Sequence, residues 1–503
     1  MSAITKTYNW LMDGNEITGQ MIGDVVRESR ERAEEMKKLY ERYKVTKLGV
    51  PILTRTYEIE NISKINNKLA NDFFGDIVNT KVGYFVGNPI VYKYQDLKDP
   101  DTELLQSFLK RNAYEDLDSE TAKMAAICGI SVRYLYVNLE GEASVINVPP
   151  WECVFINDEI GISDAPYAIR YYTLEREEKT YTKVEFFDED TITYWIREGE
   201  TTSEGAFIID KQEEANPLAH MMKGCPLVAF PNNEEMVGDC ERVLSLIDGY
   251  DRTLSDMNSE IEQFRLAYMA FIGMVPTEET IIKAKQTGAF GFPEKDSRME
   301  FVTKNINAVA VENHLQMLEK NIDYFAQSVR FNDEAFGGAS GVAMKFKIFN
   351  LESKCIIAER KFTKSLRKMM KVLSGYFDRK GISFDPMEFE FVFVRNFPLN
   401  LLEEAQTLAT LKGLVSDQTA FSQMSFIKDP EEEKELILQE QQDYMKYSQM
   451  MGINSPDEEQ SYVEPAEEEP INGEATEEIP AEEESPESAA FKAFSKFATG
   501  NGE

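Results

Sequence analysis

Reactive side chains are few in this chain and lie far apart. Its 503 residues include two histidines and five cysteines, which are His220, His314, Cys128, Cys153, Cys225, Cys240 and Cys355. No two cysteines have the spacing of a zinc site, and neither histidine has a nucleophile or ligand partner at a recognisable distance in sequence. We therefore expect no enzyme activity, no metal and no cofactor. We expect structural histidines and free thiols in a reducing cytosol.

One loop, residues 331–341, superficially resembles a phosphate-binding loop because it is rich in glycine. Its sequence is FNDEAFGGASG. A P-loop requires GxxxxGK[ST] directly after a strand, whereas this loop joins two helical segments and no Gly-Lys-Ser/Thr follows. The phosphate-loop interpretation is therefore rejected. A plain hinge between two helices remains as the simplest alternative.

Three helical segments position this loop. Apolar residues recur at steps of three and four over residues 243–264, 311–329 and 344–373, which predicts one apolar stripe on each helix. The third would be a rod of about 45 Å, and a rod of that length usually bridges domains or subunits. Between the first two segments lies a compact insert, residues 267–306.

The remaining elements indicate an α+β chain. Helical spacing predicts a solvent-facing helix at 18–43, further helices at 65–82 and 104–126, and a helical region at 399–450 with breaks near 413–416 and 429–430. Short segments rich in β-branched and aromatic residues predict an antiparallel meander. Its expected strands are 90–94, 131–137, 144–148, 153–156, 167–172, 182–187, 191–196, 206–209, 225–231 and 388–394. Within the insert we expect strands at 266–274, 289–292 and 299–302 and a helix at 277–286.

The chain is strongly acidic. It has 54 Lys and Arg against 89 Asp and Glu, for a net charge of −35. Residues 452–503 hold fifteen acids and two lysines, a net charge of −13, so residues 1–451 carry a net charge of −22. Such a chain does not coat nucleic acid non-specifically, although it can surround DNA without gripping it. We expect the tail to be disordered, with a short docking helix at 489–497 as the alternative. Neither a signal peptide nor a membrane span is visible.

Basic residues gather on the outer face of the third helix, in contrast to the rest of the chain. Three interpretations of this face fit the sequence: it packs against an acidic neighbouring subunit, it faces phosphates, or it is solvated. Its members are Lys345, Lys347, Lys354, Arg360, Lys361, Lys364, Arg367, Lys368 and Lys371.

Four motifs in a fixed order resemble a known family. They are YFVGNPI at 84–90, PNNEEMVGD at 231–239 running into IDGYD at 247–251, FGGASGVAMK at 336–345 followed by Glu352 and ERKF at 359–362, and DPEEE at 429–433. Together they resemble the portal (head-to-tail connector) proteins of tailed bacteriophages, of the siphovirus type, over about residues 60–450.

The resemblance implies a multi-domain α+β portal fold. We expect an N-terminal helix and wing periphery at 1–64, the wing at 65–238, a first stem helix at 239–266, the clip at 267–306 and a second stem helix at 307–330. A tunnel loop at 331–341, a long helix with a wing strand at 342–398, crown helices at 399–451 and a disordered acidic tail at 452–503 would follow.

The resemblance also implies a function. Portal proteins form a ring, usually of twelve subunits, at one capsid vertex, and double-stranded DNA is packaged and ejected through it. The implied partners are terminase, then head-completion (adaptor) proteins, and the major capsid and scaffolding proteins, with no membrane. The implied location is the host cytoplasm during assembly and the portal vertex of the capsid in the finished virion. The alternative is a non-enzymatic α+β adaptor or scaffold that does not contact DNA.

Site residues follow from the same resemblance. The tunnel loop would touch DNA through Asn332, Asp333, Glu334, Ala335, Phe336, Gly337, Gly338, Ala339, Ser340 and Gly341. Just behind it, Lys345 and Lys347 would contact DNA or a neighbouring subunit. The clip would meet terminase and adaptor proteins through Pro276, Thr277, Glu278, Glu279, Lys283, Phe290, Phe292, Glu294 and Lys295.

Overall fold

The computed structural model describes residues 2–56, 65–94, 99–158, 162–264, 268–273, 275–288, 296–302, 308–330 and 345–396, with parts of 406–450. The chain divides into two units, residues 1–431 and 432–503. The expected strand at 289–292, the loop at 331–341 and the tail at 452–503 lie outside the described residues. No helix among the described residues has the length and apolar character needed to cross a membrane.

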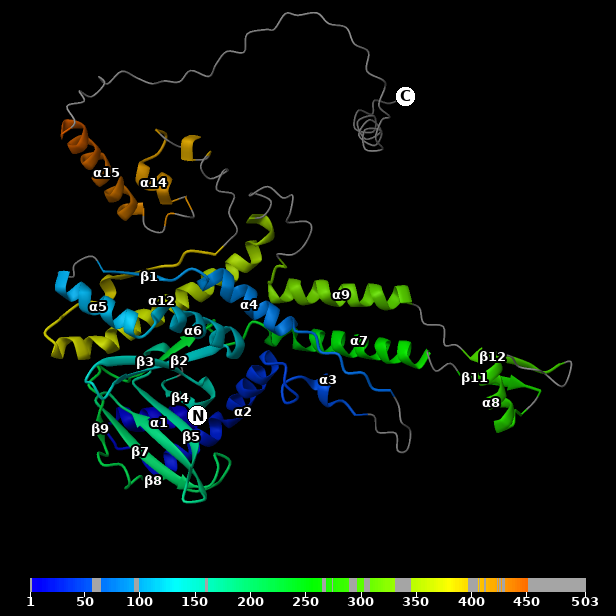
Figure 1. Cartoon of the computed structure of the whole chain (residues 1–503). Coiled ribbons are helices and arrows are strands. Elements are labelled where there is room, and N and C mark those ends of the chain that lie inside the picture. Colours follow the sequence, from blue (N-terminus) through cyan, green and yellow to red (C-terminus); the bar gives the residue numbers. More distant parts are fainter. Residues whose placement is uncertain are drawn as a thin grey trace, which may run out of the picture. The chain divides into compact units, whose positions relative to one another are not determined.

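The three organising helical segments are present as α7, α9 and α12, which confirms their prediction (Figure 1). The helices are α1 (Ala3–Met12), α2 (Gly19–Tyr43), α3 (Pro51–Thr54), α4 (Phe73–Val86), α5 (Asp99–Arg111), α6 (Tyr114–Cys128), α7 (Leu244–Phe264), α8 (Glu278–Thr287), α9 (Ala308–Ala326), α12 (Phe349–Arg379), α14 (Asp417–Ser422) and α15 (Pro430–Met450). The predicted helix at 104–126 is wrong in one respect. It is two helices, α5 and α6, because Ala113 takes a left-handed conformation (φ 45°) between them.

The strands pair antiparallel, as the meander pattern predicts. Their order is β10-β2-β3 in one sheet and β4-β5-β6-β7-β8 in a larger one, where β9 also pairs with β7. The strands are β1 (Val91–Tyr94), β2 (Ile130–Val137), β3 (Ala143–Val148), β4 (Cys153–Ile156), β5 (Tyr167–Arg176), β6 (Lys179–Phe187), β7 (Thr191–Glu198), β8 (Ile208–Ile209), β9 (Leu218–Ala219), β10 (Leu227–Pro231), β11 (Tyr268–Ile272), β12 (Arg298–Val302) and β13 (Phe389–Val392).

Helix α12 packs against the three-stranded sheet and forms the largest core. Its apolar stripe is buried there through residues four or three apart, among them Leu351, Cys355, Phe362, Leu366 and Leu373. The same core takes in the pair β1–β13, whose register sets Val91 opposite Val392. Segments about 300 residues apart in sequence thus share one core.

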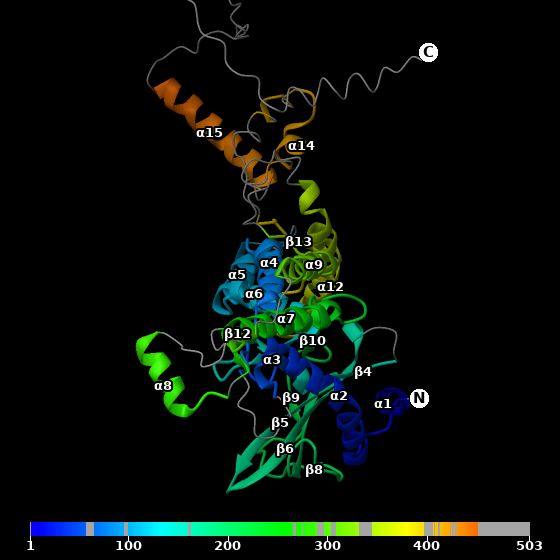
Figure 2. The ribbon, with the colours of Figure 1, turned by 90° about the vertical axis from the view of Figure 1, so that its right-hand side faces the viewer.

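Helices α1 and α2 cover one face of the larger sheet (Figure 2). Ile22 and Val25 of α2 are fully buried against Ile169 of β5 and Val184 of β6. The prediction of a solvent-facing helix at 18–43 is therefore wrong about its surroundings.

Most charges of α2 lie on its outer face, although Arg42 is buried and pairs with Asp248. The first half of its apolar stripe packs on the larger sheet, and the second half, with Met36 and Leu39, packs in a core shared with α4 and α6.

The predicted helix at 65–82 begins eight residues late, at Phe73, where the Asp72 side chain accepts a hydrogen bond from the Gly75 N–H. Residues 65–72 instead form a strap along α7. The backbone N–H groups of Asn67, Leu69 and Asn71 donate to Ser259 Oγ (3.0 Å), Ser255 Oγ (2.9 Å) and Asp251 Oδ1 (2.9 Å). Alternate residues of an extended chain rise about 6.6 Å and every fourth residue of a helix about 6 Å, so the two repeats match.

One fully buried ion pair joins the layers of the main core. Arg133 of β2 is completely buried, and its Nη2 lies 2.6 Å from Asp118 Oδ1 of α6. Its guanidinium also stacks over the ring of Phe230, with 4.5 Å between the guanidinium carbon and the ring centroid. Tyr92 of β1 donates its O–H to Asp118 Oδ2 at 2.9 Å. Four elements therefore depend on one charged pair.

We expect Asp118→Ala to lower the free energy of unfolding by about 3–5 kcal/mol, because it leaves the buried Arg133 charge without a counter-ion. The double change Arg133→Met with Asp118→Leu removes both charges and should cost much less than the single change. Urea unfolding of the monomeric protein measures the free energy of unfolding of the single and of the double variant. As a control, Asp24→Ala removes an exposed pair with Arg27 and should cost at most about 1 kcal/mol. Equal losses for Asp118→Ala and Asp24→Ala would refute this account.

Candidate functional site

The predicted tunnel loop, Asn332 to Gly341, lies outside the described residues, so the structure tests none of its ten members. The chain on both sides of it is described. Residue 330 is the last before the gap, and residue 345 is the first after it. The geometry of these two anchors therefore defines where the loop starts and ends.

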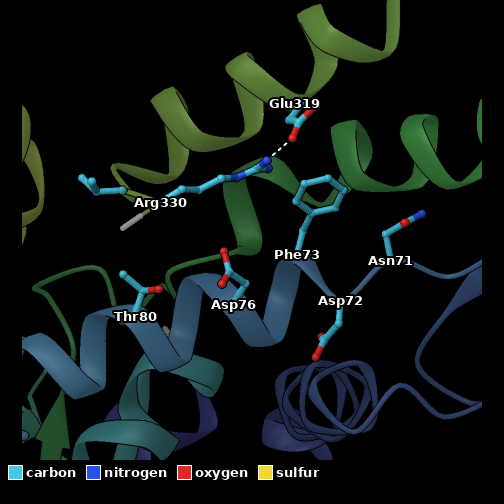
Figure 3. A pocket seen from close by; sticks show the side chains of 8 residues that line it. Asn71, Asp72, Phe73, Asp76, Thr80, Glu319 and Arg330 are labelled. Carbon is cyan, nitrogen blue, oxygen red and sulfur yellow. Dashed lines mark hydrogen bonds and ion pairs between the residues drawn. The ribbon is translucent and has the colours of Figure 1, made fainter. Parts of the chain in front are cut away.

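Arg330 anchors the chain before the loop. It forms ion pairs with two carboxylates of α9, Glu319 and Asp323, with 3.0 Å between Arg330 Nε and Asp323 Oδ2. Its guanidinium also lies 5.4 Å from the ring centroid of Phe73, at the start of α4. Figure 3 shows Arg330, Glu319 and Phe73 around a cavity of about 470 Å³ between α4 and α9. The segment after α9 is thus folded back onto its own helix and onto α4.

Lys345 and Lys347 lie beyond the loop, in a helical turn that precedes α12, and both are exposed. Ile348 follows at once and is buried in the main core. The chain is therefore fixed at Ile348, seven residues after the loop's last residue, Gly341. The two lysines are placed near the loop in sequence, as expected, but their contact with DNA or with a neighbouring subunit stays a prediction.

A buried polar cluster links the two anchors. Lys81 of α4 donates to Asn232 Oδ1 at 2.5 Å and lies 2.9 Å from Asp239 Oδ2. Lys354 of α12 donates to the carbonyl oxygen of Ala326, the last residue of α9, at 2.8 Å, and its Nζ is 3.7 Å from Asp239 Oδ1. A lysine at a helix C-terminus satisfies a free carbonyl and opposes the negative end of the helix dipole. The end of α9 and the second turn of α12 are therefore held together across the loop.

In this cluster the carboxylate of Asp239 and the two ammonium groups stabilise each other's charged forms. Burial alone would raise the pKa of Asp239, but the ammonium groups of Lys81 and Lys354 outweigh it, so that pKa lies below its ordinary value. Burial lowers the pKa of Lys354, and Asp239 opposes that shift. One carboxylate thus serves two buried lysines.

The turn that carries Asp239 is the PNNEEMVGD motif of the sequence. Asn233 Oδ1 accepts the Val237 N–H at 2.9 Å, and the Gly238 N–H donates to Glu241 Oε1 at 2.6 Å. A Cβ on Gly238 would lie 2.4 Å from the carbonyl oxygen of Ile127, so only glycine fits. The motif therefore places a buried carboxylate. This role was not predicted from the sequence, where Lys81, the one basic residue of the largely apolar helix α4, was the available signal.

The basic face of α12 is not uniform. Three of its lysines pair within the chain, Lys354 with Asp239, Lys361 with Glu234, and Lys364 with Asp164. Burial lowers the pKa of Lys368, another member of this face. A wholly solvated face is therefore excluded. Arg360 and Lys371 remain exposed.

The expected clip contains an antiparallel hairpin and a helix. Strands β11 and β12 pair with Tyr268 opposite Val302, and α8 lies between them in sequence. Of the predicted contact residues, Pro276 is half-buried, whereas Thr277, Glu278, Glu279 and Lys283 are exposed before and within α8. Phe290, Phe292, Glu294 and Lys295 lie outside the described residues. Sequence analysis missed two exposed apolar residues here, Val275 and Ile282.

Of the two histidines that were expected to be structural, His220 has a buried environment, whereas His314 on α9 is exposed. His220 is buried, and its Nδ1 accepts the Met222 N–H at 3.2 Å. Burial raises the pKa of every cysteine thiol, to about 12 for Cys128 and about 11 for Cys355. In the part of the chain that the structure describes, no three His, Cys, Asp or Glu side chains are grouped as metal ligands.

We expect Asp239→Asn to lower the free energy of unfolding by about 3–5 kcal/mol, since it leaves Lys81 and Lys354 buried without a carboxylate. Asp164→Asn, which removes only the exposed pair with Lys364, should cost at most about 1 kcal/mol. Hydrogen exchange should speed up at the end of α9 and the start of α12 in Asp239→Asn alone.

The pH dependence follows from the lowered pKa of Asp239. A carboxylate whose pKa is lower in the folded state stabilises the fold above its unfolded pKa of about 3.9, and this stabilisation is lost as pH falls through the folded value. The difference between wild type and Asp239→Asn should therefore be full at pH 7 and shrink below about pH 4. A difference that does not change with acidification would contradict the assignment.

The sequence matches one protein family over most of its length. Residues 23–447 match the sequence model of the family described as Phage portal protein, SPP1 Gp6-like. The chain is 27% identical over 438 residues to the Portal protein of Bacillus phage SPP1, covering 80% of this chain and 83% of that protein. It is 23% identical over 426 residues to the Portal protein of Clostridium phage phiCD119, covering 80% and 90%. Because the family match includes α4, α7, α9, α12 and both anchors, this chain has the α+β portal fold and belongs to the SPP1 Gp6-like phage portal proteins.

Proposed function

We propose that copies of this portal protein close into a ring at one capsid vertex, and that double-stranded DNA enters and leaves the capsid through the ring. The family match over residues 23–447 carries the proposal. By the same reasoning the ring has twelve subunits, lies in the virion after assembly in the host cytoplasm, and contacts the major capsid and scaffolding proteins. An adaptor or scaffold that does not contact DNA is the alternative function.

The charge of the chain suits a conduit. A channel must enclose the duplex and still release it at each step of translocation. Clustered lysines and arginines on the wall would bind phosphates tightly, with a strong dependence on salt. Residues 1–451 carry a net charge of −22, and several lysines of α12 are already neutralised by carboxylates of the same chain. This balance favours sliding over tight binding.

In this proposal residues 332–341 line the channel and touch DNA. Gly337, Gly338 and Gly341 permit changes of backbone conformation at little steric cost. Asp333 and Glu334 repel phosphate. Because Arg330 is fixed by α9 and Ile348 is buried, the ends of the loop stay in place while its middle changes shape. Lys345 and Lys347 lie behind the loop, where they attract phosphate weakly or meet the neighbouring subunit.

Imaging purified protein by electron microscopy tests the ring directly, and end-on views should show an opening wide enough for duplex DNA. Replacing residues 332–341 by a short glycine-serine linker should leave rings intact and block packaging, because the anchors on either side are untouched. Protein that stays monomeric or dimeric under all assembly conditions would contradict the proposed DNA conduit and favour the alternative function, an adaptor or scaffold. Normal packaging by the linker variant would remove the loop from the mechanism.

The clip is proposed to bind terminase during packaging and head-completion proteins afterwards. Val275 is 92% exposed just before the charged start of α8, and Ile282 within α8 is 50% exposed, so both are accessible to a partner. The predicted residues Thr277, Glu278, Glu279 and Lys283 follow Val275 in sequence.

We expect Val275→Asp combined with Ile282→Asp to preserve rings and to abolish terminase binding in a pull-down assay, since charges replace the apolar contact. Ile208→Asp is the matched control, because Ile208 on β8 is an apolar residue whose exposure, 65%, lies between those of Ile282 (50%) and Val275 (92%). Terminase binding that survives the clip changes, or is lost equally in the control, would contradict this docking site.

A further inference from the structure

The second half of α12 carries a row of cations that the proposed function does not use (Figure 1). Between residues 360 and 371 they follow one another at steps of four, three, one and three, so they share one face of the helix over about 16 Å. Both ends of this cationic row are exposed. Its members are Arg360, Lys364, Arg367, Lys368 and Lys371.

A loop between β9 and β10 brings a sixth cation, Lys223, beside this row. The backbone N–H of Lys223 donates to the carbonyl oxygen of Val372 at 2.9 Å. A Cβ on Gly375 would lie 2.6 Å from the same backbone nitrogen, so only glycine at this position of α12 lets the loop come so close. Lys223 itself is exposed. We call the cationic row together with Lys223 the basic patch.

Carboxylates are scarce around the basic patch. Among the residues that the structure describes, Asp164 is the one acid that forms an ion pair with it, at 3.1 Å from Lys364. Burial lowers the pKa of Lys368, and the charge of Lys371 lowers it further, which indicates that like charges are crowded here. Six cations and one paired carboxylate sum to a local charge of +5.

The net negative charge of the chain does not cancel this patch. At physiological salt the interaction between exposed charges is screened over about 8 Å, and the cationic row alone is about 16 Å long. An anion at the patch is therefore attracted by the nearby cations more strongly than it is repelled by acids on distant parts of the surface. The patch attracts anions locally, although residues 1–451 carry a net charge of −22.

The basic patch lacks the features of a protein contact. The cores of protein interfaces are built on apolar and aromatic anchors, and lysine is depleted in them. In the first half of α12, Phe349 and Ile357 are 65% and 51% exposed, whereas no large apolar side chain is exposed in the described stretch 358–386. A surface that offers charge alone suits phosphate groups, which lysine and arginine bind without apolar contacts.

We propose that the basic patch binds the phosphodiester backbone of double-stranded DNA, in addition to the contact proposed for the tunnel loop. Arg360 and Arg367 each offer a planar fork that matches two phosphate oxygens, and the lysines act as point charges between and beside them. Contacts to phosphates carry no sequence information, so binding is independent of sequence. The inference takes from the proposed function only that duplex DNA passes this protein.

The contact is weak by design of its size. With at most six phosphate contacts, the slope of the logarithm of the binding constant against the logarithm of salt concentration is at most about −5, half of what a tight repressor shows. Such a contact forms and breaks readily near physiological salt. It is therefore compatible with DNA that keeps moving.

Binding of short duplexes to the full-length protein, followed by fluorescence anisotropy at several salt concentrations, tests the site. The triple change Arg360→Gln, Lys371→Gln and Lys223→Gln removes three exposed cations. Because each phosphate contact contributes about 0.9 to the salt slope, the slope should become shallower by about 3, and the affinity at about 50 mM salt should fall at least tenfold. Two duplexes of unrelated sequence should be affected alike.

The matched control combines Lys6→Gln, Lys110→Gln and Lys211→Gln. It removes the same net charge from exposed positions on α1, on α5 and after β8, away from the patch. Its affinity and salt slope should stay close to those of wild type, and circular dichroism and thermal melting establish that both triple variants are folded. Equal losses in the two triple variants would show that only net charge matters and would overturn the site.

Ring assembly and a polyglutamate peptide distinguish DNA from a protein partner. The patch variant should form rings as wild type does, and polyglutamate should bind the wild-type patch more weakly than DNA. A folded patch variant that forms no rings, or a patch that prefers polyglutamate, would overturn the DNA contact in favour of a protein contact. Wild-type protein that binds DNA through the patch but never forms rings would contradict the proposed conduit instead, so the two failures are distinguishable.

Discussion

The buried pair of Arg133 and Asp118 is the constraint on which the main core depends. A guanidinium with no exposure to water needs a carboxylate and aromatic faces around it, and here α6 supplies the acid while Phe230 of β10 and Phe362 of α12 supply the rings. Tyr92 of β1 completes the set. These elements come from three stretches of the sequence, residues 91–137, 227–231 and 349–379. Because a buried unpaired charge is costly, all of them must be in place together, which makes the fold of this region cooperative.

The same physical rule operates in the helices on either side of the glycine-rich loop, with a different consequence. Lys81, Lys354 and Asp239 are charged groups out of water, and their pairing holds the helices before and after the loop in one arrangement. The core of the protein is thereby rigid up to the loop's anchors. In an acidic chain this use of lysines also withdraws positive charge from the surface, so that the net repulsion of phosphate is preserved.

Much of the architecture could be predicted from the sequence because its signals are local. The apolar stripes that identify α7, α9 and α12 depend only on side-chain spacing, and alternation and turn residues identify most strands. The strap at 65–72 could not be predicted in this way. Leu69 continues the spacing of α4, but hydrogen bonds to Ser255 and Ser259, nearly 200 residues away, hold that segment extended. Tertiary contacts therefore overrode the local pattern.

By itself the sequence determined the acidic balance, the order of helices and strands, the glycine-rich loop between two helices and the resemblance to portal proteins, all of which depend on residue types and their spacing. Only the tertiary structure decided which lysines of α12 are paired and which are exposed. Lys354 and Arg360 look alike in sequence, yet one lies beside Asp239 and the other faces solvent. The free energy of a charge depends on burial and on partners distant in the chain, and spacing along a helix carries no information about either.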